Sequence, residues 1–162
     1  MNKKQILLFL FLLGLDQGAK YLAVFYLENE SLTIIPNFFE LYLAYNKGAA
    51  WSIFQNQIVF FLIIGIIALY YLRKLENDFK KNSLRLIVFT SLYAGIIGNM
   101  IDRLFLGYVR DFLKFTIFGY HFPIFNPADI FIVLGGICLI WYCIRGDENE
   151  KIRSREYRKT KN

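Results

Sequence analysis

The chain is 162 residues long, about the length of one domain, and 56% of its residues are hydrophobic, including seventeen Phe and eleven Tyr. A soluble domain of this size has too little interior to hide so many apolar side chains, so the composition favours an integral membrane protein. The net charge of +6 would suit nucleic-acid binding, but the placement of the basic residues excludes that class in favour of a membrane protein.

Four apolar segments predict four transmembrane helices within a single membrane domain over residues 1–162. Two of the segments have cores of fifteen residues without a charge. A bilayer needs ~20 residues, so flanking residues must complete each helix. The predicted spans are residues 4–25, 58–72, 84–101 and 128–144, with outer loops at 26–57 and 102–127 and a basic tail at 145–162.

Fourteen of the nineteen Lys and Arg residues lie at the N-terminus, between the second and third spans, or in the basic tail. With four spans these places share one side of the membrane, which the positive-inside rule makes cytoplasmic. Both termini are therefore predicted to be cytoplasmic, and the tail to contact lipid headgroups. The N-terminal apolar run resembles a secretory signal peptide without a convincing cleavage site, so we interpret it as a retained helix.

The first span contains two charged residues on one helix face. Asp16 and Lys20 are spaced i, i+4 and can form an ion pair. Gly14 and Gly18 form a GxxxG pattern, which permits close approach of another helix. The pair is interpreted as a structural anchor of the first helix, with support of a functional site as the alternative.

The first outer loop contains a predicted strand followed by a turn of small residues. Residues 38–46 (FFELYLAYN) alternate well enough for a strand, and the turn follows at 46–54. The loop is rich in aromatic residues, which favour the membrane interface. We predict a small extracytoplasmic β-like cradle or lid, with simple interfacial anchoring as the alternative.

The third span ends in a polar face, because Asn99, Asp102 and Arg103 are spaced i, i+3, i+4. The second outer loop then carries Asp111 and an aromatic segment at 112–126. Single acidic residues at such places are usually caps or solvated loop residues. Several acids near one membrane face indicate a site, because ionisable groups inside membranes are costly.

The fourth helix has a clear N-terminal signal in the sequence Asn126-Pro-Ala-Asp129. Asn is a favoured N-cap and Pro suits the first helical position. Asp129 is therefore predicted in the first turn, at the outer membrane face.

Nucleophilic and metal chemistry are poorly supported by this sequence. His121 is the only histidine, and a Ser–Lys dyad would need Ser52 with Lys20 or Lys47. Two cysteines inside the fourth span, Cys138 and Cys143, lack metal-ligand spacing and are interpreted as small buried hydrophobic residues. We predict no metal and no cofactor.

A pair of carboxylates is the best remaining acid–base system. Two such groups in one site do not both ionise readily, so one can hold a proton while the other activates water against a carbonyl. From the residues alone, the pairing stays open among Asp16, Asp102, Asp111 and Asp129.

Four sequence blocks resemble lipoprotein signal peptidases (signal peptidase II) over nearly the whole chain. The blocks occur in the order of that family: LDQGAK at 15–20, NKGAAWS at 46–52, GNMIDRLFLGYVRDF at 98–112 and FNPAD at 125–129. The resemblance implies a multi-pass aspartic endopeptidase of the bacterial inner membrane, with its site near the extracytoplasmic face, and we expect it to act as a monomer. Its implied substrates are diacylglyceryl-modified prolipoproteins, cut before the lipidated cysteine.

The resemblance also implies roles for individual residues. Asp111 and Asp129 match the catalytic pair. Residues that match positions lining or supporting the site are Asn46, Gly48, Asn99, Arg103 and Asn126, and residues that match structural positions are Asp16, Lys20 and Asp102. We further expect Asp129 to be the base, because a helix N-terminus favours its anion, and Asp111 to be the acid.

Two other classes of protein remain as alternatives. A small proton-coupled transporter or channel would use intramembrane acids as a proton relay, but it should spread them through the membrane depth. A non-catalytic membrane scaffold would tolerate replacement of either Asp111 or Asp129 by Asn.

Overall fold

The structure, a computed structural model, describes residues 2–48, 57–79 and 82–159, with side chains as far as residue 144. Its elements are four helices and a four-stranded antiparallel sheet in the order β1-β2-β3-β4. In chain order they are α1 (Lys3–Leu27), β1 (Leu32–Ile35), β2 (Phe39–Asn46), α2 (Ile58–Asp78), α3 (Ser83–Leu106), β3 (Val109–Ile117), β4 (Tyr120–His121) and α4 (Pro127–Lys159).

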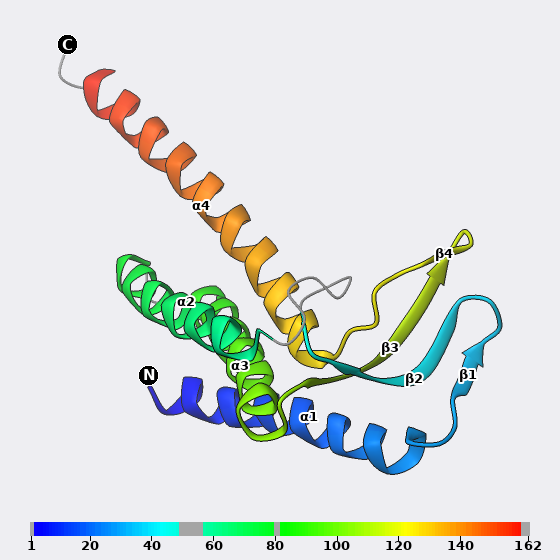
Figure 1. Cartoon of the computed structure of the whole chain (residues 1–162). Helices are drawn as coiled ribbons and strands as arrows, with labels where there is room; N and C mark the ends of the chain where they lie inside the picture. Colours follow the sequence, from blue (N-terminus) through cyan, green and yellow to red (C-terminus); the bar gives the residue numbers. More distant parts are fainter. Residues whose placement is uncertain (1, 49–56, 80–81, 160–162) are drawn as a thin grey trace.

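The helices form a bundle, and the sheet lies at one end of it (Figure 1). The start of α1 and the far end of α4 both point away from the sheet. Each helix contains a stretch that is long and apolar enough to cross a membrane, and α3 is the most buried of the four. Apolar side chains cover the outside of the bundle, as expected where lipid rather than water is the solvent. The fold class predicted from the sequence, four spanning helices with a small β structure, is confirmed.

All four helices are longer than the sequence suggested, α1 by only three residues, since it runs from Lys3 to Leu27. α2 continues from residue 72 to Asp78, and α3 passes through Asp102 and Arg103 to Leu106. α4 continues beyond residue 144 through the basic segment to Lys159. The charged residues did not end α3, because the carboxylate of Asp102 and the guanidinium of Arg103 both find partners inside the protein.

The predicted strand at 38–46 is confirmed as β2, but the other strands were not foreseen. β3 pairs with β2, so that Ala44 faces Asp111 and Asn46 faces Val109. The sequence of β3 lacks a clean alternation of apolar and polar residues, because it is partly buried along most of its length. The turn at 46–54, with Trp51, Ser52 and Phe54, extends beyond the described residues.

A second polar cluster lies at the end of the bundle opposite the sheet. The buried Glu76 of α2 accepts hydrogen bonds from Gln5 of α1 (2.9 Å) and Tyr93 of α3 (3.0 Å). Arg85 of α3 forms an ion pair with the same carboxylate at 3.2 Å. This cluster ties three helices together, and its members were not singled out in the sequence because they are far apart along the chain.

Two predictions about packing in the spans are wrong. Cys138 and Cys143 are exposed on α4, where a thiol is apolar enough to face lipid. Gly14 and Gly18 face open space, because the packed face of α1 carries Asp16 and Lys20 instead. Close approach of helices occurs elsewhere. A Cβ on Gly98 of α3 would lie 2.5 Å from Asp16 Oδ2, and a Cβ on Gly135 of α4 would lie 2.8 Å from Leu92 Cγ.

The glycine contacts give a direct test of this packing. Gly98→Ala should displace the Asp16 carboxylate and destabilise the protein by roughly 1–3 kcal/mol, as overpacking does in close-packed interiors. Gly14→Ala is the matched control, since its new methyl group meets nothing within 4 Å. It should be neutral or stabilise the helix by ~0.5–1 kcal/mol. Thermal unfolding of both variants in nanodiscs measures the difference, and equal melting temperatures would contradict the packing described.

Candidate active site

Asp111 lies on β3 close to the point where the chain leaves α3. α3 ends at Leu106, and the positive φ of 79° at the following Gly107 allows the turn into the strand. Asp111 is buried, with 3% of its surface exposed. Its Oδ2 accepts a hydrogen bond from Asn46 Nδ2 of β2 at 2.9 Å, and its Oδ1 accepts one from Asn126 Nδ2 at 2.6 Å. The carboxylate is therefore held by the neighbouring strand on one side and by the start of α4 on the other.

Backbone hydrogen bonds bring Asn126 to Asp111. Phe125 accepts from the N–H groups of Phe112 (3.1 Å) and Leu113 (2.9 Å), and its own N–H donates to Leu113 O (3.2 Å). The segment before α4 thus runs beside β3 like a short additional strand. Stacked rings reinforce the contact, because Phe115 lies against both Phe39 and Phe125.

Asp129 lies in the first turn of α4, as predicted. Asn126 caps that helix, since its Oδ1 accepts from Asp129 N at 3.2 Å. In return, Asn126 N donates to Asp129 Oδ2 at 3.1 Å. Asp129 Oδ1 accepts from Asn99 Nδ2 of α3 at 2.8 Å. A reciprocal cap and one amide of α3 therefore fix this carboxylate.

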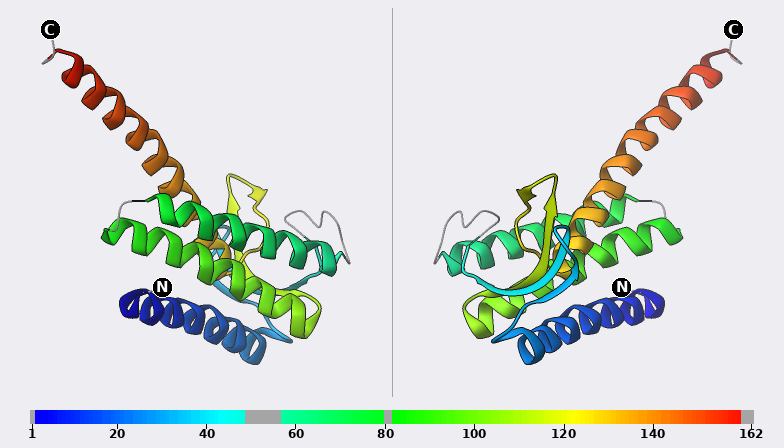
Figure 2. Two further views of the ribbon diagram at one scale, coloured as in Figure 1. Left: turned by 90° about the vertical axis from the view of Figure 1, so that its left-hand side faces the viewer. Right: turned by 90° about the vertical axis from the view of Figure 1, so that its right-hand side faces the viewer.

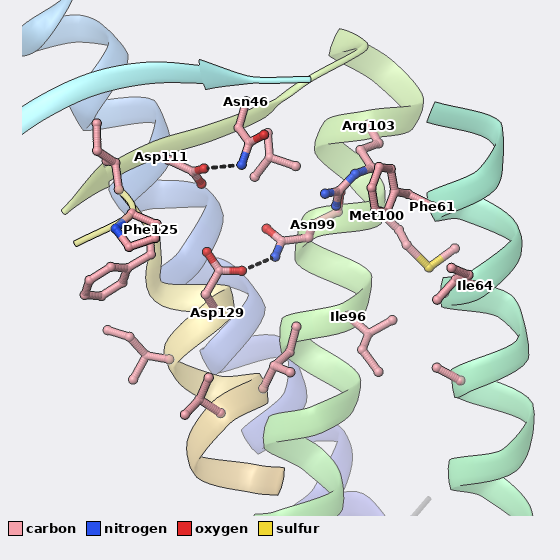
Figure 3. Close-up of a pocket in the computed structure, with 18 of the residues that line it drawn as sticks. Asn46, Phe61, Ile64, Ile96, Asn99, Met100, Arg103, Asp111, Phe125 and Asp129 are labelled. Atoms are coloured by element: carbon pink, nitrogen blue, oxygen red, sulfur yellow. Dashed lines mark hydrogen bonds between the residues drawn. The ribbon is translucent and has the colours of Figure 1, made fainter. Parts of the chain in front are cut away.

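The two carboxylates share one intervening amide. Asn126 Nδ2 donates to Asp111 and also to Asn99 Oδ1, at 3.2 Å, while Asn99 in turn donates to Asp129. Figure 3 shows Asp111 and Asp129 pointing toward the same space, with Asn46 and Asn99 beside them. The other two candidate acids, Asp16 and Asp102, instead form ion pairs with Lys20 and Arg110 in an adjoining network, which Asn99 links to Asp129.

Arg103 links α3 to the loop that begins after β2. Its Nη2 donates to Gly48 O at 3.1 Å, and its guanidinium lies 4.7 Å from the centre of the Phe61 ring on α2. Gly48 N also donates to Asn46 Oδ1 at 2.9 Å. Arg103 thereby fixes the turn that carries Asn46, which contacts Asp111.

Lys20 is the centre of the buried ion-pair network. Its side chain is fully buried, and Nζ lies 3.0 Å from Asp16 Oδ2, 2.9 Å from Asn99 Oδ1 and 3.6 Å from Asp102 Oδ2. The predicted pair of Asp16 and Lys20 is confirmed. Asp16 does more than pair with it, because its Oδ1 accepts from Ala128 N at 3.0 Å and so satisfies a free N–H group at the start of α4.

Two members of this network were missed in the sequence. Arg110 binds Asp102 through Nη2 (2.7 Å), Nε (3.1 Å) and its backbone N–H (3.0 Å), which fixes the start of β3. Gln17 accepts from Arg110 Nη2 at 2.8 Å and donates to Asp102 at 3.3 Å. No helical or strand spacing could have found them, because the end of α3 and a turn separate Asp102 from Arg110, and Gln17 lies on α1. Within the described residues, every buried side-chain N or O atom has a hydrogen-bond partner.

A cavity of about 610 Å³ adjoins the carboxylate pair. It lies between α2, α3 and α4, and the segment before α4 also lines it, with Phe125 beside the two carboxylates (Figure 3). The rest of its lining is largely apolar, including Ile64 and Ile96, and its polar lining side chains are Asn46, Asn99, Arg103, Asp111 and Asp129. An apolar cavity with a few convergent polar groups is the usual form of a binding site for an apolar ligand.

The environment of Asp111 favours its protonated form. Burial raises the pKa of this carboxyl to about 7, and the nearby charge of Asp129 adds to the increase. The hydrogen bonds from Asn126 and Asn46 act in the opposite direction, because they stabilise the anion. An acid with a pKa near neutrality can donate a proton under physiological conditions.

Metal binding finds no support among the described residues, where no group of three or more His, Cys, Asp or Glu side chains is arranged to hold an ion. His121 lies on the exposed strand β4, and its Nδ1 is 3.0 Å from Thr116 Oγ1. It does not line the cavity. Lys20, one of the two lysines considered for a Ser–Lys dyad, is enclosed by acids.

The fold and the site together define a multi-pass α-helical membrane protein with a pair of buried carboxylates beside an apolar cavity. The family model described as signal peptidase (SPase) II matches residues 8–145. The chain therefore belongs to the signal peptidase II family, an aspartic peptidase family.

Relatives and solved structures agree with that assignment. A lipoprotein signal peptidase of Staphylococcus aureus strain bovine RF122 / ET3-1 is 38% identical over 158 residues, covering 93% of this chain and 97% of the relative. That of S. aureus strain JH9 is 37% identical over 161 residues, with the same coverage. Two bacterial membrane enzymes solved by the in meso method, at 2.3 and 1.9 Å resolution, superpose with TM-scores of 0.78 and 0.75. They are 36% and 37% identical and cover 90% and 86% of this chain, and the matches span 90% and 92% of the solved chains.

The role of Lys20 can be tested by removing its charge. Lys20→Met should destabilise the protein by about 3–5 kcal/mol, because it leaves buried carboxylates without their cation. Lys114→Met is the matched control, since Lys114 pairs with Glu40 near the surface of the sheet at 2.8 Å. That pair should contribute less than about 1 kcal/mol. Denaturation in detergent compares the two variants, and equal losses would show that the network does not stabilise the fold.

Proposed function

We propose that Asp111 and Asp129 are the catalytic pair of an endopeptidase that removes the signal peptide from diacylglyceryl-modified prolipoproteins, before the lipidated cysteine. The observation that carries the proposal is that the two carboxylates share Asn126 and adjoin a largely apolar cavity between membrane-spanning helices. Prolipoprotein processing itself follows from the family and from the relatives named above. Membership of this family also argues against the two alternative functions, a proton-coupled transporter and a non-catalytic scaffold.

In the proposed reaction, ionised Asp129 takes a proton from water as the water oxygen attacks the scissile carbonyl carbon. Asp111 donates its proton to the carbonyl oxygen, and a tetrahedral diol forms. Asp129 then gives its proton to the leaving amine nitrogen, while Asp111 recovers one from a hydroxyl of the diol. Two observations support this division of roles. The backbone N–H of Asn126 donates a hydrogen bond to Asp129 Oδ2 at the N-terminus of α4, which favours the Asp129 anion. The raised pKa of Asp111 favours its protonated form.

The remaining site residues are proposed to position the pair. Asn126 and Asn99 orient the carboxylates, and Asn46 fixes the second oxygen of Asp111. Arg103 with Gly48 holds the turn that carries Asn46. A structural role is proposed for Asp16, Lys20 and Asp102, which join α1, α3 and the start of α4.

The proposed setting is the bacterial inner membrane, with both termini in the cytoplasm and the site near the extracytoplasmic face. The distribution of Lys and Arg supports this orientation. A substrate with two acyl chains can enter laterally from lipid, which suits a cavity between helices. Membrane lipids and the lipidated substrate are the proposed partners, and the enzyme is proposed to act as a monomer without a cofactor.

Replacement of either catalytic carboxyl tests the assignment. Asp111→Asn and Asp129→Asn should each lower kcat for a diacylglyceryl prolipoprotein by at least about 10²-fold, because each removes one proton-transfer step. Glu40→Gln is the control, since Glu40 lies on the same sheet but pairs with Lys114. Its activity should stay near that of the wild type. Retained cleavage in either Asn variant, measured by the mass of the released peptide, would refute the assignment.

The pH dependence of kcat/KM tests the division of roles. Asp111 must be protonated, so activity should fall as the pH rises through about 7, its pKa in the folded protein. Asn46→Ala removes a hydrogen bond that lowers this pKa, so the descending limb should move to higher pH. Asn77→Ala, an exposed residue far from the sheet, is the control. A limb that stays in place or moves to lower pH in Asn46→Ala would contradict Asp111 as the acid.

A further inference from the structure

The turn between β3 and β4 has an unusual residue at its tip. Ile117 pairs with Tyr120, so Phe118 and Gly119 form a two-residue turn with positive φ angles of 49° and 80°. Such turns favour Asn or Asp followed by Gly, because these residues tolerate positive φ. The other described residue with positive φ that is not glycine, at the turn between β1 and β2, is Asn37. A bulky aromatic residue at this position therefore has no advantage for the backbone.

Phe118 gains nothing from packing either. Its relative exposure is 105%, the largest of any exposed large hydrophobic residue among those described. The neighbouring Ile117, Tyr120 and Phe122 are 42%, 55% and 46% exposed. Residues 115–124 contain no Asp, Glu, Lys or Arg. The hairpin thus places an uncharged aromatic tip in the surrounding medium, which water would disfavour and the membrane interface would favour.

The position of the hairpin fits contact with lipid. The hairpin leads directly through residues 122–126 into the membrane-spanning α4. Figure 2 shows the hairpin running across the direction of α1, α2 and α3 rather than along it. When the helices span a bilayer, a hairpin that leaves the end of the bundle in this direction extends sideways, toward the lipid beside the protein. Apolar residues of α4 that do not line the cavity, such as Ile137 and Ile140, are also exposed, at 58% and 63%.

We propose that the tip of this hairpin, residues 117–120, inserts into the interfacial region of the same bilayer that the helices span. The anchored hairpin steadies β3, which carries Asp111, and the adjoining segment that ends at Asn126. Insertion goes beyond the proposed peptidase reaction and does not depend on it. Its effect on activity does rest on the proposed function.

The insertion is measured with a fluorescent label next to the tip. A single cysteine is placed by Ile117→Cys in a Cys138→Ser, Cys143→Ser background and labelled with NBD. The protein is reconstituted into nanodiscs of phosphatidylethanolamine and phosphatidylglycerol, with or without doxyl-labelled lipid. We expect a blue-shifted emission and strong quenching by the doxyl lipid. Glu30→Cys, in the exposed loop before β1, is the control position and should be quenched less.

The Phe118→Asn variant distinguishes the effect of the apolar side chain on insertion from the effect of the turn conformation. Asn suits positive φ, so the hairpin should persist while quenching of the label at position 117 falls toward that of the control. Quenching at 117 no stronger than at 30, or unchanged in Phe118→Asn, would overturn the proposal. A label that responds to added prolipoprotein but not to doxyl lipid would indicate a substrate contact and would also overturn it.

Two further measurements keep this test distinct from that of the peptidase function. Quenching at position 117 should be unchanged by Asp111→Asn, because insertion needs no catalysis. With active protein, Phe118→Asn should raise KM several-fold in nanodiscs and leave cleavage of the same substrate in detergent unchanged. Insertion with an unchanged KM would overturn the steadying of β3, and loss of cleavage in both media would show that the hairpin itself had been damaged.

Discussion

The relative positions of α1, α3 and α4 depend on one buried cation, the ammonium group of Lys20. Lys20 is surrounded by Asp16, Asp102 and Asn99. The charged side chains of Lys20 and of the two aspartates are fully buried. An isolated charge buried in this way would be costly, so each ion requires the others. Because the partners come from α1 and α3, they fix the relative position of two helices. Asp16 then extends the constraint to α4 through Ala128 N, so the helix that carries Asp129 is positioned from α1.

The same network also positions the strand that carries the second carboxylate. Asp102 binds the backbone and the guanidinium of Arg110, the residue before Asp111. The two acidic residues of the pair therefore lie on different elements, a strand and a helix, that one set of buried charges aligns. Asn126 completes the alignment, since it contacts both carboxylates. In this way the ion pairs leave Asp111 and Asp129 without a cation in direct contact among the described residues, and burial raises the pKa of Asp111 to about 7.

The rest of the protein presents apolar side chains to the lipid and keeps its buried charged groups in a few clusters inside the bundle. The outer faces of the helices are apolar and match lipid, while the buried charged residues of the described chain gather in the carboxylate site, in the adjoining Lys20 network and in the Glu76 cluster at the other end. The cavity between α2, α3 and α4 joins an apolar surface to a polar one, because its lining is apolar along the helices and polar at the two carboxylates. A lipidated peptide needs both surfaces at once. The sheet beside the site supplies aromatic contacts that suit the membrane interface.

The sequence by itself determined the features that depend on local spacing. Apolar runs predicted the four helices, the i, i+4 spacing predicted the pair of Asp16 and Lys20, and Asn126-Pro127 predicted the start of α4. Local spacing could not choose Asp111 and Asp129 among four acids, a choice that the motifs made only by resemblance. The tertiary structure brought the two carboxylates together, because that proximity depends on the pairing of Leu113 with Phe125 and on contacts between residues far apart in sequence. It also decided which glycines are packed and that the cysteines face outward, since a helix that is apolar on every side does not reveal which face is buried.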